Sequence, residues 1–257
     1  MPAAAELVHL AVRSGIATIT LDSPANRNAL SAQLRAELLA ALERSSHDHS
    51  VRVVVLDHTG PAFCAGMDLR EPQQESEQGV SEFRQILEQI YTHPKPVVAK
   101  LAGSARAGGI GMVAAADVAV AANNATFAFT EVRIGLVPAV ISVTVLPRLL
   151  PRAAHELFLT GETFDATRAV AVGLLNSTVS ADQLAAEVAR YTGMLSTGAP
   201  EALMLTKQML HRNHASAMAE NFTTMLELSA QRFVSAEGRE GIRAFAEKRP
   251  PSWVAMP

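Results

Sequence analysis

Three short stretches of the sequence combine small residues with a candidate acid or base. They are FCAGMDL at residues 63–69, GSARAGGIGM at 103–112 and FTEVRIGLVP at 129–138. Because glycine has no Cβ, turns built from such stretches let backbone N–H groups approach a ligand closely. If the first two turns face each other, one amide from each can bind the same oxygen atom as an oxyanion hole, and Glu131 can transfer protons beside it. The stretches predict chemistry at a carbonyl group that develops negative charge.

Taken singly, each stretch also has a simpler interpretation. Glycine-rich turns in α/β proteins usually serve packing, and a lone glutamate near a strand end is more often a surface or capping residue. The second stretch lacks the G-x-G-x-x-G pattern of dinucleotide-binding turns. A functional prediction therefore depends on the order and spacing of several features together.

The elements that would position these residues alternate between strands and helices, which predicts an α/β core. Ranges 7–12 and 16–21 read as a hairpin, and further strands are expected at 51–56, 96–101, 118–121 and 126–129. Ser31 suits the N-cap of a helix that runs to about residue 46. A second helix is expected over 81–91, and Gly108-Gly109 should open a third. The polar range 71–79 lacks periodicity and predicts a mobile loop.

From about Pro151 onward the sequence predicts helices only. The expected helices cover 151–159, 166–172, 182–196, 199–213, 217–234 and 237–247. We therefore expect a catalytic core over residues 1–195 and a helical region over 196–257.

Composition restricts the possible partners. The net charge of −3 gives no reason to expect nucleic acid. No apolar run approaches the ~18–20 residues of a membrane span, and the N-terminal residues lack the pattern of a secretory signal. Cys64 is the single cysteine, so an internal disulfide is excluded, and a reducing compartment is favoured. We expect a cytoplasmic protein without a membrane partner.

Several motifs, in one order along nearly the whole chain, resemble the enoyl-CoA hydratase/isomerase (crotonase) superfamily. They are PANRNAL at 24–30, FCAGMDL, KPVVAKLAG at 95–103, ARAGGIGM at 105–112, AAADVAVAA at 114–122, FTEVRIGLVP, LTGE at 159–162 and FAEKR at 245–249. The resemblance implies a crotonase-like core of repeated ββα units in a spiral. It also implies C-terminal helices that build homotrimers, often paired as hexamers. The implied ligand is an acyl-CoA thioester, with CoA carried on the substrate and no separate cofactor or metal.

The resemblance also implies roles for individual residues. The oxyanion donors would be the backbone N–H groups of Met67 and Gly108, and Glu131 would be the acid/base. Residues implied to contact the CoA portion are Asn26, Arg27, Ala29, Ala65, Asp68 and Lys248, with Arg249 as the alternative to Lys248. The range 71–79 and the helix over 81–91 would wall the acyl pocket.

One departure from the family pattern concerns the reaction itself. The best-known hydratases of the superfamily use two glutamates, and the first falls where this chain has Gly111. A single acid/base suits a Δ3,Δ2-enoyl-CoA isomerase, which only moves a proton from C2 to C4. The stretches GGIGM and TEVRIGLVPAVIS, however, also resemble a hydratase subgroup with glycine in that position. We therefore predict a 2-enoyl-CoA hydratase, with the isomerase as the alternative.

The sequence is also compatible with functions other than hydration and isomerisation. A non-catalytic acyl-CoA-binding protein belongs to another class, and a hydrolase or decarboxylase would use the same oxyanion hole. Ala139, where dienoyl-CoA isomerases and dehalogenases of the superfamily carry aspartate, weighs against those two branches. Glu88 is a weak candidate for a replacement second acid. Cys64 is interpreted as a packing residue. Two histidine pairs, His47 with His49 and His211 with His214, are interpreted as surface residues rather than metal ligands.

Overall fold

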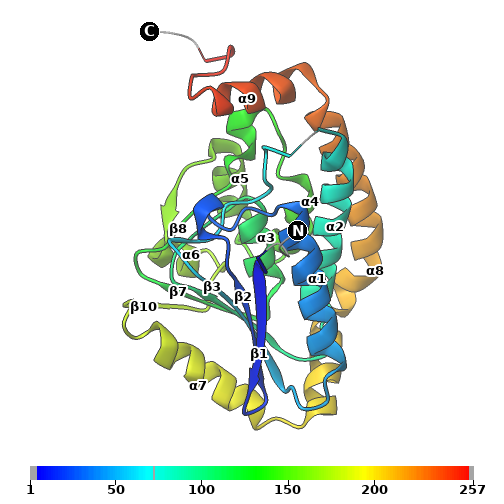
Figure 1. The fold of residues 1–257 in the computed structure, drawn as a ribbon, viewed down its shortest axis with the longest axis vertical. Helices are drawn as coiled ribbons and strands as arrows, with labels where there is room; N and C mark the ends of the chain where they lie inside the picture. The colour runs from blue at the N-terminus through cyan, green and yellow to red at the C-terminus, as the bar shows by residue number, and fades with distance from the viewer. Residues whose placement is uncertain (1–4, 72, 255–257) are drawn as a thin grey trace.

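The computed structural model describes residues 5–71 and 73–254, with the side chains of 73–77 and 213–216 outside the description. Two sheets form its centre (Figure 1). The larger has the strand order β1 (Val8–Arg13), β2 (Ile16–Leu21), β3 (Val53–His58), β5 (Val97–Leu101), β7 (Val118–Ala122) and β10 (Ser177–Val179). The smaller has the order β4 (Ala62–Cys64), β6 (Ser104–Arg106), β8 (Thr126–Ala128) and β9 (Phe164–Asp165).

A ββα unit repeats along the chain. Each unit places one strand in the larger sheet, one in the smaller sheet, and then a helix: β3–β4–α2 (Gln73–Tyr91), β5–β6–α3 (Gly108–Ala115) and β7–β8–α4 (Ala139–Val145). Neighbouring strands are parallel except in the pairs β1–β2 and β8–β9. The predicted α/β class and ββα spiral are confirmed.

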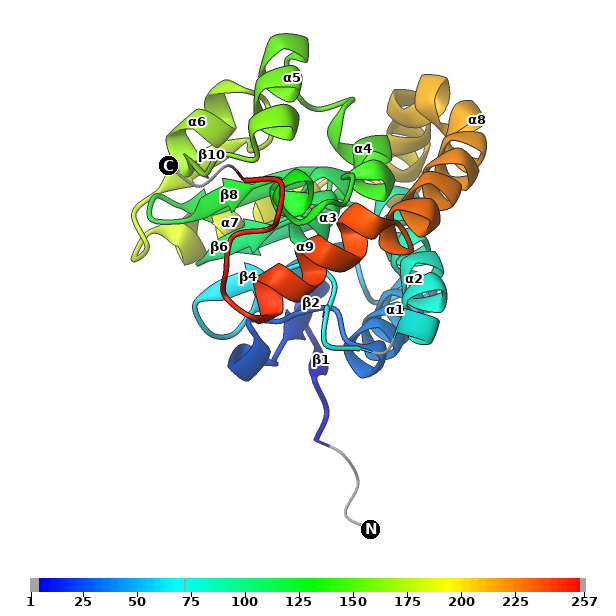
Figure 2. The same cartoon turned by 90° about the horizontal axis from the view of Figure 1, so that it is seen from above.

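The remaining helices surround the sheets. They are α1 (Ala32–His47), α5 (Pro151–Thr160), α6 (Ala166–Ala171), α7 (Leu184–Ser196), α8 (Pro200–Phe233) and α9 (Ala236–Ala246), with 3₁₀ turns at Pro24–Asn26 and Thr130–Ile134. Helix α8 packs beside α2 and α4, and α9 packs on the Thr130–Ile134 turn (Figure 2). The C-terminal helices are thus in direct contact with the core, and the predicted division at residue 195 stays a prediction.

Both faces of the larger sheet are covered by apolar side chains. Successive residues of each strand point to opposite faces, so they contribute to two different clusters. In β3, Val54 and Leu56 belong to the apolar core beneath α1 to α4, whereas Val53 and Val55 pack on the other face against Leu184 of α7. Strands buried on both faces read as continuous apolar runs, which is why β3, β5 and β7 are visible in the sequence.

Several expectations were wrong. Most of the predicted loop 71–79 belongs to α2, because glutamate and glutamine favour helix without any apolar periodicity. The two helices expected over 199–213 and 217–234 form the single helix α8, since neither glycine nor proline interrupts it. The region after Pro151 is not wholly helical, because it contributes the short strands β9 and β10.

Two further observations concern membrane proteins and metal enzymes. Within the described ranges, none of the helices combines the length and the apolar character required to cross a bilayer. Among the same residues, no three histidine, cysteine, aspartate or glutamate side chains gather as a metal site would require.

Candidate active site

A cavity of about 600 Å³ opens where β4, β6 and β8 end. Its walls come from the segments around 25–29, 65–70, 106–108 and 130–141, from α2 and from the C-terminal helices. Met67, Gly108 and Glu131 all line this cavity. The three residues that the sequence predicted to act together are therefore brought together by the ends of three neighbouring strands.

The turn after β4 approaches the start of α3 closely. Gly66 has φ +91°, and a Cβ built there would lie 2.9 Å from the Ala107 Cβ and 3.4 Å from the Gly108 nitrogen. The Leu30 N–H donates to the Gly66 carbonyl oxygen at 2.8 Å, which holds the turn from its other side. The two glycine-containing turns thus face each other, as an oxyanion hole requires.

Helix α3 directs free N–H groups at the cavity. Gly108 is its first residue, so the Gly108 N–H has no partner within the helix. Within the described residues, neither this N–H nor that of Met67 donates a hydrogen bond to another protein group. The residue before the helix, Ala107, has φ 48° and ψ −118°, a conformation that costs about 1–3 kcal/mol for a residue with a side chain. The surrounding structure must therefore hold this turn in place.

Gly109 explains how α3 is held so near β4. A Cβ at Gly109 would lie 2.5 Å from the Cys64 carbonyl oxygen and 2.9 Å from the Cys64 Cβ. Cys64 itself is buried, and burial raises the pKa of its thiol to about 12, which agrees with a packing role. The close approach of helix and strand is possible because both contacts involve small groups.

Gly109→Ala is expected to destabilise the fold by about 1–3 kcal/mol, because the new methyl group meets backbone atoms that cannot rotate away. Urea unfolding measures this change in the free energy of unfolding. The control is Gly193→Ala in α7, where nothing lies within 4 Å of the added Cβ. That variant should be more stable by about 0.5–1 kcal/mol, since alanine favours helix. Equal stability of the two variants would contradict the packing argument.

Glu131 occupies the Thr130–Ile134 turn and has an unusual environment. The residue as a whole is partly exposed, but its Oε2 atom is buried and has no hydrogen-bond partner within the described part of the chain. Burial raises the pKa of the carboxyl group to about 7. A group with that pKa can accept and return a proton near neutral pH.

The position of the missing first glutamate is filled by packing. A Cβ at Gly111 would lie 2.8 Å from the Ile141 Cγ2 atom and 3.4 Å from the Leu87 Cδ2 atom. Glu88, the weak candidate for a replacement, pairs with Arg84 at 2.8 Å and is not among the residues that line the cavity. The structure thus provides no second carboxylate at either place.

The predicted CoA-contacting residues separate into two groups. Those that line the cavity are Asn26, Arg27, Ala29, Ala65 and Asp68. Lys248 is not among the lining residues. The Arg70 guanidinium binds both Asp68 carboxylate oxygens, at 2.8 and 2.7 Å, and holds the pKa of that carboxyl below its usual range.

Arg27 was expected beside the ligand, but the cavity also contains positive charges to which the sequence analysis gave no role. Five arginines line it: Arg27, Arg70, Arg106, Arg133 and Arg232. Arg106 donates to Thr126 and to the Ala105 carbonyl oxygen, all of them uncharged acceptors. An excess of guanidinium groups favours a ligand that carries several negative charges, such as phosphates.

Arg35 is a further residue that the motifs did not reveal. It is 1% exposed, and its guanidinium binds Glu71 and Glu82, each at 2.9 Å, as well as the Leu30 carbonyl oxygen. Glu71 in turn accepts from the Ala32 N–H at the start of α1. This network fixes both ends of the segment that contains Met67. An inward-facing arginine on α1 was the available signal, but its acidic partners are distant in sequence.

Comparison with known proteins places the chain among its relatives. Residues 11–255 match the family described as enoyl-CoA hydratase/isomerase. A Thermus thermophilus protein provisionally named enoyl-CoA hydratase is 35% identical over 243 residues, covering 92% of this chain and 96% of that one.

Solved structures give the same result. An enoyl-CoA hydratase from Mycobacterium avium has 40% identity and a TM-score of 0.90, with 98% of this chain and 100% of that chain covered. A methylmalonyl-CoA decarboxylase has 27% identity and a TM-score of 0.86, with the same coverage. Sequence and fold agree, and the chain belongs to the enoyl-CoA hydratase/isomerase family.

Proposed function

We propose that the protein is an enoyl-CoA hydratase, which adds water across the C2=C3 bond of a 2-enoyl-CoA thioester. The observation that carries acyl-CoA chemistry is the shared cavity. It combines two unpartnered N–H groups, of Met67 and Gly108, with a carboxyl group whose pKa is raised to about 7. The choice of hydration is supported by relatives that are named hydratases.

In the proposed mechanism, the thioester oxygen accepts hydrogen bonds from the Met67 and Gly108 N–H groups. The Glu131 carboxylate removes a proton from water while the resulting hydroxide bonds to C3. The C2=C3 electron pair moves toward the thioester, and the oxyanion hole stabilises the enolate. Protonated Glu131 then returns the proton to C2. One carboxyl group therefore serves as base and afterwards as acid, without a second glutamate.

The arginine-lined part of the cavity would hold CoA. Asn26 supports this placement, because its Oδ1 atom is buried without a partner in the described part of the chain, so a ligand N–H can donate to it. The opposite wall, with Val80, Phe83 and Ile141, is apolar and suits the acyl group. CoA would enter as part of the substrate, so that no separate cofactor is needed. The homotrimer or hexamer implied by the resemblance stays a prediction, as does a cytoplasmic location.

A Δ3,Δ2-enoyl-CoA isomerase is the second candidate. Ile141 fills the space beside Gly111, so Glu131 stands without the second carboxylate used by the best-known hydratases. Proton transfer from C2 to C4 needs only one such group. The likeness to a methylmalonyl-CoA decarboxylase adds decarboxylation as a third reaction compatible with the same oxyanion hole.

A paired assay tests the proposal. Purified protein is incubated with crotonyl-CoA and with 3-hexenoyl-CoA, and products are followed by absorbance and mass. We expect 3-hydroxybutyryl-CoA to form at least tenfold faster than 2-hexenoyl-CoA. Faster isomerisation would establish the second candidate instead. Tight binding of acyl-CoA without turnover of either substrate, or of methylmalonyl-CoA, would favour a non-catalytic binding protein.

A further inference from the structure

Asn28 is a buried polar residue beside the active site that takes no part in the mechanism described above. It is 0% exposed and, unlike the residues on either side of it, does not line the active-site cavity. Its Oδ1 atom accepts from the Ser23 N–H at 2.7 Å. Its Nδ2 atom donates to the carbonyl oxygens of Thr59 at 3.0 Å and of Ala62 at 2.8 Å. One side chain thus ties the loop 23–28 to the end of β3 and to the start of β4.

The backbone of this loop has a conformation that suits asparagine. Arg27 and Asn28 have φ angles of 59° and 54°, so two successive residues are left-handed. Residues other than glycine rarely adopt this conformation, and asparagine is among those that do so most often. The Asn28 N–H also donates to the Ser23 carbonyl oxygen at 2.9 Å. The loop is therefore closed on itself by both main-chain and side-chain bonds.

The residues that follow this loop lie alongside the segment that leads from β4 to the Met67 turn. The Ala65 N–H donates to the Arg27 carbonyl oxygen at 3.1 Å, and the Leu30 N–H donates to the Gly66 carbonyl oxygen at 2.8 Å. Leu30 and Met67 also form an isolated parallel β-bridge. The position of the Met67 turn therefore depends on the position of residues 27–30.

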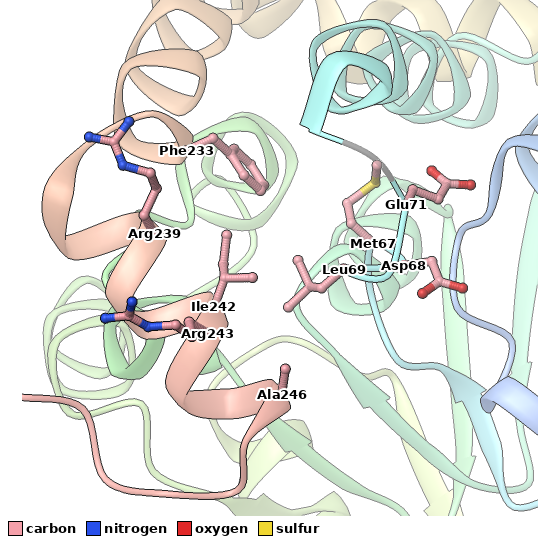
Figure 3. A pocket seen from close by; sticks show the side chains of 9 residues that line it. All are labelled: Met67, Asp68, Leu69, Glu71, Phe233, Arg239, Ile242, Arg243 and Ala246. Atoms are coloured by element: carbon pink, nitrogen blue, oxygen red, sulfur yellow. The ribbon is translucent and has the colours of Figure 1, made fainter.

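The opposite side of the Met67 segment faces helix α9 (Figure 3). There Leu69 points toward Ile242, whereas the Asp68 and Glu71 carboxylates point away from α9. Apolar side chains give no directional contact, so they cannot orient a peptide group. The orientation of the main chain at Met67 must come from the hydrogen bonds on the other side.

The hydrogen bond to Gly66 orients the proposed oxyanion donor. The Gly66 carbonyl and the Met67 N–H belong to one trans peptide unit, so they point in opposite directions. Because the Leu30 N–H holds the oxygen, the Met67 N–H is directed away from residues 27–30 and is left free for a ligand. A hydrogen bond at the oxygen also polarises the peptide unit and strengthens its N–H as a donor.

From these observations we propose that Asn28 is a positioning residue for the oxyanion hole. By holding the loop 23–28 against β4, Asn28 sets the place of the Leu30 N–H and, through it, the direction of the Met67 N–H. The inference rests on the proposed function, because it takes the Met67 N–H as a donor to the thioester oxygen. Asn28 itself touches neither the cavity nor the reacting atoms.

The test measures the carbonyl stretch of a bound thioester, which requires no turnover. Butyryl-CoA with a ¹³C-labelled thioester carbonyl is bound to each protein, and infrared difference spectra record its frequency. Hydrogen bonds to the oxygen lower this frequency, so the shift reports the donors of the oxyanion hole. Asn28→Gly removes the side chain but tolerates the positive φ. Asn28→Asp keeps an acceptor for the Ser23 N–H and has at most one donor for the two carbonyl oxygens.

Asn176→Gly is the matched control. The Asn176 Oδ1 atom also accepts a main-chain N–H, that of Ala119, at 2.8 Å, but Asn176 does not line the active-site cavity. Urea unfolding of all variants shows how much stability each has lost. A control that loses stability but keeps the full infrared shift separates positioning of the Met67 amide from a general loosening of the fold.

We expect the unmodified protein to lower the carbonyl frequency and Asn28→Gly to lose about half of that shift, because one of two donors is displaced. The kcat for crotonyl-CoA hydration should fall at least about tenfold, and Asn28→Asp should lie between the two proteins in both measurements. If Asn28→Gly does not fold, the spectrum of Asn28→Asp decides. A full shift in the folded Asn28 variants, or an equal loss in Asn176→Gly, would overturn the role of Asn28.

Two other outcomes separate this inference from the proposed function. No shift with the unmodified protein would refute the oxyanion hole, and both the proposed function and the role of Asn28 would fall with it. A normal shift that is reduced in the Asn28 variants, without any hydration of crotonyl-CoA, would refute the reaction and leave the role of Asn28 standing.

Discussion

Glu131→Gln is expected to reduce kcat for crotonyl-CoA hydration by about 10²–10⁴-fold, the usual contribution of one general acid/base. Glutamine preserves the size of the side chain but cannot accept the proton of water. Affinity for butyryl-CoA should stay within twofold, because binding depends on other parts of the cavity. Steady-state kinetics and calorimetry measure the two effects, and a variant with full activity would remove Glu131 from the mechanism.

The same residue predicts a pH dependence in the unmodified protein. Hydration begins with the Glu131 carboxylate as base, so kcat/KM should fall as pH decreases through about 7.

The stability of the folded protein should change with pH in the opposite direction to its activity. The folded protein retains the Glu131 proton up to about pH 7, whereas the unfolded chain loses it near 4.5. The contribution of this carboxyl group to the free energy of unfolding therefore falls by about 3 kcal/mol as the pH rises from 4.5 to 7.

Glu131→Gln separates these effects, because glutamine does not titrate. Relative to the unmodified protein, the variant should gain up to about 3 kcal/mol of stability between pH 5 and pH 8 while it remains inactive. Urea unfolding at both pH values measures this gain. An unchanged stability difference would mean that the carboxyl group is not held protonated by burial.

Arg35→Met is expected to lower the free energy of unfolding by about 3–5 kcal/mol. The substitution leaves Glu71 and Glu82 facing a buried space without their shared cation. Activity should fall as well, mainly through kcat, because Arg35 holds the Leu30 carbonyl and Glu71 on either side of the Met67 turn. Denaturant unfolding and steady-state kinetics test these two statements.

The matched control is Arg168→Met. Arg168 pairs with Glu156 at 2.9 Å, but both side chains are nearly half exposed. Exposed pairs contribute about 0–1 kcal/mol, so this variant should resemble the unmodified protein in stability and in kcat. If both variants lose the same stability, burial of the Arg35 network has no special consequence. If Arg35→Met keeps a normal kcat, the network does not position the Met67 amide.

The parts of the fold that could be predicted are those with a strong local signal. β3, β5 and β7 are apolar runs because both faces of the sheet are covered, and the Ser31 side chain caps α1 as expected. The short strands β4, β6, β9 and β10 have two or three residues each, so their existence depends on neighbouring strands rather than on their own composition. The start of α2 was missed because its residues favour helix by propensity alone.

The residues of the site also separate into those with a local sequence signal and those without one. Met67, Gly108 and Glu131 lie within motifs whose order along the chain is informative, and the structure places them in one cavity. Arg35 could not be predicted, because its partners lie 36 and 47 residues away and meet it only after folding. A small cavity between α9 and residues 67–71 was likewise hidden, since Ile242 and Ala246, which line it, are far from residue 69 in the chain.

The contact between Gly111 and Ile141 also constrains how this enzyme could change over generations. An acidic side chain at 111 would first encounter the Ile141 methyl group, 2.8 Å from its Cβ. A smaller residue at 141 would have to appear beforehand, and by itself that change leaves a void and offers no new chemistry. The route toward a two-carboxylate active site is therefore ordered, and its first step lacks an immediate advantage.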